Sequence, residues 1–203
     1  MSLLARALSA LPDVALGVLF LVTWLDPRVF GGGVLKYAML TMLMEFIVVH
    51  SSGFMGLVLW GSSFGVVKKT LATLGLGAFY TTFLVAFALA TEAWWPVWAF
   101  WGLTVNRLTN ALLSRKGGKQ ARANVANDWV TSAAFYLLWV IGTSFLWIPA
   151  LGITPAVVAA AALPGKGLWV EQPYRVVVAG AGYFLCQAWC ELRGGGLLGA
   201  KHS

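Results

Sequence analysis

The chain has 203 residues, of which 60% are hydrophobic and 10% are charged, with 11 Trp, 12 Phe and 5 Tyr. Soluble domains carry about 25% charged residues, and they rarely contain successive apolar runs of about 20 residues. The composition therefore excludes a soluble globular domain and a disordered chain. It also excludes a disulfide-rich secreted protein, since the chain has two cysteines, Cys186 and Cys190, and both lie in one hydrophobic segment. The net charge of +7 fits membrane orientation, and no nucleic-acid partner is expected.

Six apolar segments, bounded by Gly, Pro or charged residues, have the length of a transmembrane helix. No segment shows the ten-residue alternation of an outer-membrane barrel strand. The sequence therefore predicts an all-α, polytopic integral membrane helical bundle with six transmembrane helices, which form a single domain over residues 1–203. The predicted spans are residues 8–25, 35–60, 70–91, 95–113, 128–148 and 174–192.

Basic residues and tryptophans set the expected orientation of the bundle. The loop of residues 114–124, SRKGGKQARAN, carries four cations and no acid, which is typical of the cytoplasmic side. Both termini are therefore predicted to be cytoplasmic, and the first span is expected to insert uncleaved because no small-residue cleavage site precedes it. Tryptophans prefer the two water interfaces of a membrane. Those near span ends are Trp24, Trp94, Trp95 and Trp147 outside and Trp60, Trp129 and Trp189 inside, with Trp139 as the exception.

The stretch 152–173 is long for a turn and too poor in apolar residues to cross a membrane. It is predicted to form an outer-surface or re-entrant helix after Pro155, between the fifth and sixth spans. Small residues in LGLG at 74–77 and AGAG at 179–182 predict close helix approach, because packing drives helix association in lipid.

Three ionisable side chains fall inside predicted spans, Glu45 and His50 in the second and Arg107 in the fourth. Each costs at least about 2.5 kcal/mol at the centre of a membrane helix on insertion scales, so each needs a partner or a function. Glu45 is 9 residues in from Lys36, and Arg107 is 12 residues in from Trp95. The difference in depth is about 4–5 Å at the rise of an α-helix, so an ion pair between Glu45 and Arg107 is predicted.

Polar residues recur at helical spacing on these two spans. On the fourth span Asn106, Arg107 and Asn110 share one face, while Trp and Leu residues occupy another. On the second span Glu45 and Ser52 share a face, whereas His50 lies about 140° around the helix from Glu45. The predicted residues of a substrate or ion pathway are Glu45, His50, Ser52, Asn106, Arg107 and Asn110.

Two interpretations of these polar residues stay open. Glu45 and Arg107 either lock two helices together, as interhelical polar contacts do, or line a hydrated cavity or conduction path. A cation path would favour a free Glu45 and oppose Arg107. An anionic substrate would favour Arg107, with Asn106 and Asn110 as hydrogen-bond donors. The sequence thus favours an anion or a polar neutral solute.

A membrane enzyme with haem or a metal is disfavoured by the shortage of ligands. His50 is the one histidine inside a span, and His202 lies near the C-terminus, so a bis-histidine haem lacks its second ligand. Glu45 and His50 do not have the Glu-x-x-His spacing of di-iron bundles, and Cys186 and Cys190 are expected to be small buried hydrophobic residues. No catalytic residue, cofactor or metal site is predicted, and a non-enzymatic role is favoured.

Two short segments resemble known families. The run HSSGFMG at 50–56 resembles the serine-containing GxSG segment of rhomboid intramembrane proteases, although a serine nucleophile needs a base on another element and the spans supply none. The segments FIVVHSSGFMGLVLW and YFLCQAWCEL are similar to segments of an uncharacterised family of bacterial polytopic membrane proteins, over two of the six predicted helices. The second resemblance implies no activity.

These observations predict a membrane channel or transporter for a small polar or anionic solute or ion. The alternative is a non-catalytic accessory or assembly subunit of a larger membrane protein complex, for which short loops and a Trp-rich surface are equally suited. The expected partners are the lipid bilayer and either copies of the same chain in a homo-oligomer or other subunits of a membrane complex. Compact loops and a low cysteine count suit a bacterial cytoplasmic (inner) membrane.

Overall fold

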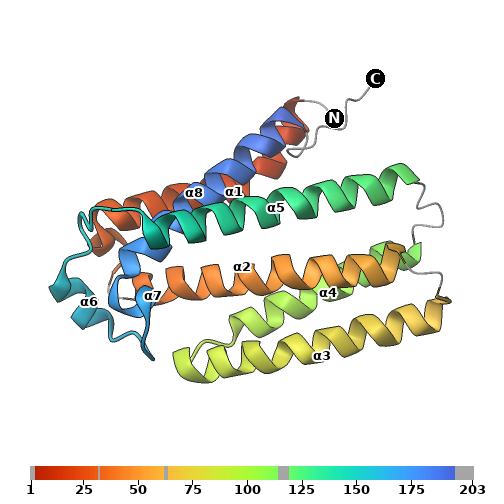
Figure 1. Cartoon of the computed structure of the whole chain (residues 1–203), viewed down its shortest axis with the longest axis horizontal. Coiled ribbons are helices and arrows are strands. Elements are labelled where there is room, and N and C mark those ends of the chain that lie inside the picture. The colour runs from red at the N-terminus through yellow and green to blue at the C-terminus, as the bar shows by residue number, and fades with distance from the viewer. Residues whose placement is uncertain (1–2, 32, 62–63, 114–118, 195–203) are drawn as a thin grey trace. The chain divides into compact units, whose positions relative to one another are not determined.

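All regular secondary structure in the described part of the chain is helical (Figure 1), which confirms the predicted all-α class for those residues. The computed structural model describes residues 3–31, 33–61, 64–113 and 119–194. Its long helices are α1 (Leu3–Leu25), α2 (Val34–Gly56), α3 (Val66–Thr91), α4 (Trp95–Leu113), α5 (Lys119–Phe145) and α8 (Pro173–Arg193). The shorter elements are the 3₁₀ turn η1 (Pro27–Phe30), the π-helical turn η2 (Leu57–Gly61) at the end of α2, α6 (Pro155–Ala161) and α7 (Leu168–Glu171).

The long helices coincide with the six predicted apolar segments, and their ends differ most at α5. This helix begins at Lys119 rather than at residue 128, because hydropathy marks the apolar stretch whereas Lys, Gln, Ala and Arg continue a helix beyond it. Within the residues that the structure describes, three helices are long and apolar enough to cross a membrane, namely Leu3–Leu25, Val34–Trp60 and Val66–Thr91. They fit the predicted membrane class. Crossing by α4, α5 and α8, and the cytoplasmic location of both termini, stay predictions.

The helices gather into two compact units. Unit 1 comprises Met1–Leu43 and Thr131–Ser203, and unit 2 comprises Met44–Val130. Helices α2 and α5 therefore contribute residues to both units. A single transmembrane domain over the whole chain stays a prediction.

Small residues allow α8 to pack closely within unit 1, where it lies beside α1 (Figure 1). A Cβ added at Gly180 would overlap the Phe20 ring of α1. A Cβ added at Gly182 would overlap the Trp139 indole of α5. Both glycines belong to the AGAG motif at 179–182, so the close helix approach predicted there is confirmed.

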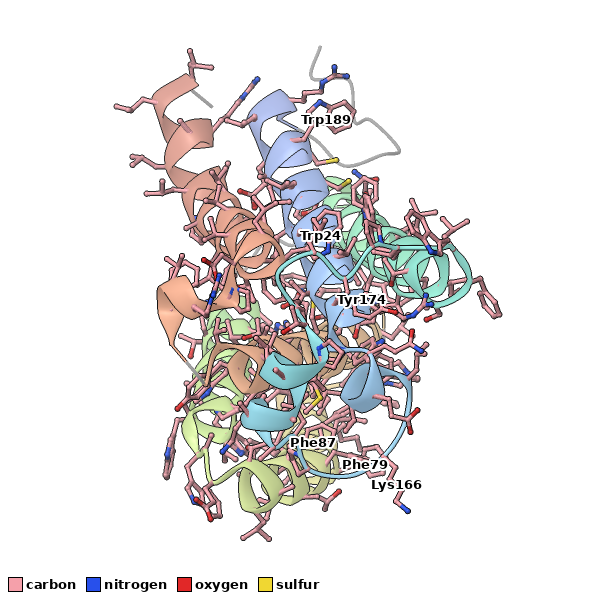
Figure 2. All side chains as sticks on the ribbon, turned by 90° about the vertical axis from the view of Figure 1, so that its left-hand side faces the viewer. Trp24, Phe79, Phe87, Lys166, Tyr174 and Trp189 are labelled. Carbon is pink, nitrogen blue, oxygen red and sulfur yellow. The ribbon has the colours of Figure 1, made fainter. Side chains whose placement is uncertain are left out.

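The core of unit 1 surrounds α8, which runs from Tyr174 near its start to Trp189 near its end (Figure 2). Val176, Val177 and Tyr183 of this helix are fully buried. Because α8 is buried along one side while Trp189 is exposed, the helix has an inward face and an outward face.

Arg175 closes the C-terminal end of α5. Its Nη1 donates to three main-chain carbonyl oxygens, those of Thr143, Ser144 and Leu146. The last carbonyls of a helix have no intrahelical partner and carry the negative end of the helix dipole. The Arg175 guanidinium supplies hydrogen-bond donors to these carbonyls and a positive charge beside the negative end of the dipole. Arg175 therefore holds the start of α8 to the end of α5.

The connection between α5 and α6 is anchored to the last turn of α1. Trp24 Nε1 donates to the carbonyl oxygen of Pro149 at 2.8 Å, and the Gly152 N–H donates to the carbonyl oxygen of Trp24 at 3.1 Å. Gly152 lies so close to the Leu25 carbonyl that an added Cβ would overlap its oxygen. Only a residue without a side chain fits at this crossing.

A short helix follows Thr154, as predicted for the stretch after Pro155. α6 begins with Pro155, which is pre-organised for the first helical turn, and Thr154 Oγ1 accepts a hydrogen bond from the Val157 N–H at 3.4 Å. Its place on the outer surface or as a re-entrant segment stays a prediction.

An exposed ion pair stabilises η1, the turn between α1 and α2. Arg28 Nε donates to Asp26 Oδ1 at 2.8 Å, and the Arg28 N–H donates to the same oxygen at 3.1 Å. The side-chain hydrogen bond from Arg28 is the main reason that the pKa of Asp26 lies below its ordinary value. The carboxylate therefore stays charged at neutral pH and caps the turn, although such an exposed pair adds little stability.

Unit 2 is built on the α3–α4 hairpin, which packs with the second half of α2. The ring centroids of Tyr80 on α3 and Phe100 on α4 lie 6.2 Å apart. A Cβ added at Gly77 would lie 3.0 Å from the Trp101 indole, so the LGLG motif at 74–77 also marks a close approach. The buried core of this unit consists of Met44, Ile47, Met55, Tyr80, Leu84, Ala88, Val97 and Phe100.

Candidate functional site

The six predicted pathway residues lie on α2 and α4, within unit 2. Their side chains differ in exposure and therefore do not form one buried group. Glu45, Ser52 and Arg107 are half-buried, His50 and Asn106 are exposed, and the side chain of Asn110 is outside the described part of the structure.

His50 packs among aromatic rings on a different face of α2 from Glu45. Its ring stacks on Phe46 with centroids 5.5 Å apart, and it meets Phe54 edge-on at 5.1 Å. Its Nδ1 and the Tyr80 hydroxyl of α3 share a hydrogen bond of 2.9 Å. This is the environment of a hydrogen-bonded, packed histidine. Within the described ranges, no group of three His, Cys, Asp or Glu side chains is placed to hold a metal ion.

The serines that follow His50 are turned back onto their own helix. The Ser52 hydroxyl donates to the carbonyl oxygen of Val48, and the Ser51 hydroxyl donates to the same oxygen at 3.2 Å. Hydroxyls bonded in this way are occupied by the backbone. The HSSGFMG segment therefore presents neither an open serine donor to a solute nor the serine–base contact that a protease needs.

Glu45 and Arg107 act on each other through their charges. The Glu45 carboxylate is near enough to the half-buried Arg107 guanidinium for an electrostatic interaction. Arg107 Nη1 is nevertheless buried and has no hydrogen-bond partner among the residues that the structure describes. A two-bond fork on Glu45 that uses this nitrogen is therefore not formed, and the relation between the two residues is a charge interaction.

Two threonines that were not predicted as site residues also have a buried polar atom without a hydrogen-bond partner in the described ranges. The hydroxyls of Thr73 on α3 and Thr104 on α4 are buried without a hydrogen-bond partner in the described ranges, and both side chains are 0% exposed. The buried Thr23, Thr91 and Thr143 instead donate to the carbonyl oxygen four residues earlier, at 2.7–2.8 Å. The hydroxyls of Thr73 and Thr104 are therefore available to donate a hydrogen bond to a ligand, whereas those three threonines donate to the backbone of their own helix.

Helix register brings these groups to one level of unit 2. Thr73 lies seven residues before Tyr80, and Arg107 lies seven residues after Phe100, on two antiparallel helices that touch at those rings. Seven residues are about two turns and about 10 Å, so both residues are displaced from that ring contact by a similar distance along their helices. Thr104 lies one turn from Arg107. Thr73, Thr104 and Arg107 are hereafter called the donor cluster.

The donor cluster offers hydrogen-bond donors to whatever occupies it. A guanidinium has five N–H donors and no acceptor, and a hydroxyl that is not bonded to a carbonyl oxygen donates readily. Charged donors bind anionic acceptors about twice as strongly as neutral partners bind each other. The cluster is therefore suited to a small anion or to the oxygen of a polar solute.

No family model, curated protein or solved structure matches the chain in comparisons of its sequence and fold. The two segments for which the sequence suggests a resemblance to an uncharacterised family lie on α2 with η2 and on α8, and that resemblance stays a prediction. The donor cluster lies on α3 and α4, outside both segments. Function therefore rests on the geometry of the site.

Proposed function

We propose that this protein is a membrane channel or transporter for a small anion, which passes the donor cluster of unit 2. The observation that carries the proposal is the buried Arg107 Nη1 without a partner among the described residues. Leaving a buried polar group unpaired costs about 1–3 kcal/mol, and more when it is charged. An anion in contact with Nη1 and with the two threonine hydroxyls would remove that cost while it is bound.

Glu45 makes such a site suitable for passage. A conducting site must bind an ion strongly enough to admit it and weakly enough to release it. The Glu45 carboxylate partly offsets the positive charge of Arg107, so an anion at the donor cluster is attracted less strongly than it would be by Arg107 alone. The two charges together favour transient binding.

Arg107→Gln is expected to lower anion uptake about tenfold or more. A hydrogen bond to a charged group contributes about 1.5–3 kcal/mol, and 1.4 kcal/mol corresponds to about tenfold. The measurement is uptake of chloride, nitrate and formate by liposomes that contain the purified chain, with potassium uptake recorded in the same vesicles.

Two threonine variants control this experiment. Thr104→Val removes an unpartnered hydroxyl of the donor cluster and is expected to lower uptake severalfold at unchanged thermal stability. Thr82→Val removes an exposed hydroxyl of α3 that donates to the carbonyl oxygen of Phe79 at 2.7 Å, and uptake should be unchanged. Equal uptake by folded Arg107→Gln and the original chain would contradict the proposal and favour an accessory subunit.

A further inference from the structure

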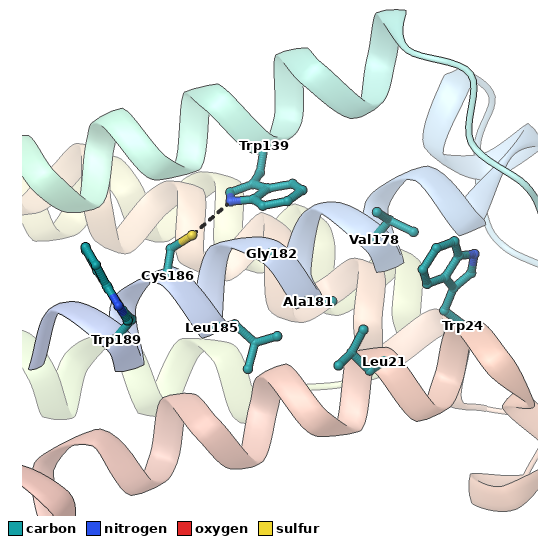
Figure 3. A pocket seen from close by; sticks show the side chains of 9 residues that line it. All are labelled: Leu21, Trp24, Trp139, Val178, Ala181, Gly182, Leu185, Cys186 and Trp189. Atoms are coloured by element: carbon teal, nitrogen blue, oxygen red, sulfur yellow. Dashed lines mark hydrogen bonds between the residues drawn. The ribbon is translucent and has the colours of Figure 1, made fainter. Parts of the chain in front are cut away.

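An apolar groove runs along α8 in unit 1, between α1 and α5 (Figure 3). Its volume is about 420 Å³, and its walls include Leu21, Trp24, Trp139, Leu185, Cys186 and Trp189. We propose that this groove is the binding site of an anionic membrane phospholipid. One acyl chain fills the groove, and the phosphate lies at the end formed by Arg6 and Arg193.

The walls of the groove offer almost no polar group to a ligand. The Trp139 N–H donates to Cys186 Sγ at 3.4 Å, inside the wall itself (Figure 3). The Trp24 N–H is directed to the carbonyl oxygen of Pro149 at 2.8 Å. The indoles of both residues therefore present apolar ring surface to the groove, which suits a hydrocarbon chain.

The length of the groove matches one leaflet of a bilayer. The stretch of α8 that lines it extends from Val178 to Trp189, which is about 16 Å at the rise of an α-helix. The hydrocarbon core of a bilayer is about 30 Å thick, so the groove covers roughly half of it. A partner helix about 10 Å wide would not fit in this volume, whereas a single acyl chain does.

Two guanidiniums stand at the Trp189 end of the groove. Arg193 Cζ lies 3.9 Å from the Trp189 ring centroid, so its charge borders the groove directly. Arg6 Nη1 donates to the Arg193 carbonyl oxygen at 3.5 Å. Arg6 Nε is buried without a hydrogen-bond partner among the residues described, and a phosphate oxygen would supply that partner.

Charge complementarity thus selects the headgroup. The acid on the same turn is Glu191, which is half-buried and already engaged, whereas Arg193 is exposed. Basic residues near a membrane surface favour anionic lipids. Phosphatidylglycerol should therefore bind better than phosphatidylcholine, although both have the same acyl chains.

The first test is retention of lipid by the full chain during gel filtration in mild detergent, after loading with phosphatidylglycerol or phosphatidylcholine. Phosphatidylglycerol should remain bound at about one per chain, and Arg193→Gln should reduce its preference over phosphatidylcholine about fivefold. Leu21→Trp, which fills the groove from α1, should release it. Val18→Trp places the same bulk on an exposed part of α1 and should not. Equal retention of both lipids, or retention by Leu21→Trp equal to that of Val18→Trp, overturns the proposal.

A second test keeps every residue that lines the groove and both arginines at its end. Cys186 lines the groove, whereas Cys190 is buried, so the Cys190→Ala chain reports on Cys186 alone. N-ethylmaleimide should label Cys186 at least several times more slowly in phosphatidylglycerol bilayers than in phosphatidylcholine bilayers. Equal labelling rates in the two bilayers overturn the proposal.

Discussion

Gly152→Ala is expected to lower the stability of unit 1 by about 2 kcal/mol or more. The added Cβ would overlap the carbonyl oxygen of Leu25, and the nearest atoms belong to the backbone, which has no alternative rotamer. Relief requires a shift of the connection, which would strain the hydrogen bonds of Gly152 and Pro149 to Trp24. Overpacking alone costs about 1–3 kcal/mol, and a lost buried hydrogen bond adds to it.

The measurement is thermal unfolding in detergent, followed by tryptophan fluorescence. Gly75→Ala is the matched control, because a Cβ at Gly75 on α3 meets nothing within 4 Å. Alanine within a helix is favoured over glycine by about 0.5–1 kcal/mol, so this variant should unfold at an equal or higher temperature. Equal unfolding temperatures for Gly152→Ala and Gly75→Ala would show that the crossing of α1 and the connection is not tight.

Arg107→Met is expected to keep or raise the unfolding temperature of the chain. Methionine fills a similar space, and the change removes a buried nitrogen that has no partner in the described ranges. Removing both charges of a buried pair is often neutral or stabilising, whereas removing one is not, so Arg107→Met is made in a chain that also carries Glu45→Gln. If this variant loses transport but unfolds at an unchanged temperature, Arg107 belongs to a solute site. If Arg107 only held two helices together, the unfolding temperature would fall.

Arg175→Met supplies the contrast with the same exchange of side chains. Arg175 Nη1 donates to three carbonyl oxygens at the end of α5, so its loss leaves several acceptors unpaired. Each such acceptor costs about 1–3 kcal/mol when it is buried, and a clear drop in the unfolding temperature is expected. If Arg107→Met lowers the temperature as much as Arg175→Met, then Arg107 is a structural lock.

Local patterns predicted most of the helices. Apolar runs located the six long helices, and Pro155 located the start of α6, because each pattern acts over neighbouring residues. The AGAG motif also predicted where α8 packs closely. The start of α5 at Lys119 was missed, since helix-forming polar residues leave no mark in a hydropathy profile.

The site was predicted less completely because it depends on contacts between helices. Depth counting predicted an ion pair between Glu45 and Arg107, and this pair stays a prediction, with an electrostatic interaction between the two residues in its favour. Thr73 and Thr104 were missed, since a threonine in a helix ordinarily donates to its own backbone and only the three-dimensional arrangement shows that these two do not. The groove is made by helices distant in sequence, so no local pattern reveals it.

In the proposed function, a passing anion is the partner of Arg107 Nη1. Crystals of the full chain grown in bromide test it most directly, because bromide is located by its anomalous scattering. An anomalous peak is expected within hydrogen-bond distance of Arg107 Nη1 and of a Thr73 or Thr104 hydroxyl, and it should disappear in Arg107→Met. Arg107 Nη1 bonded to a protein group, with no bromide beside the donor cluster, would contradict it.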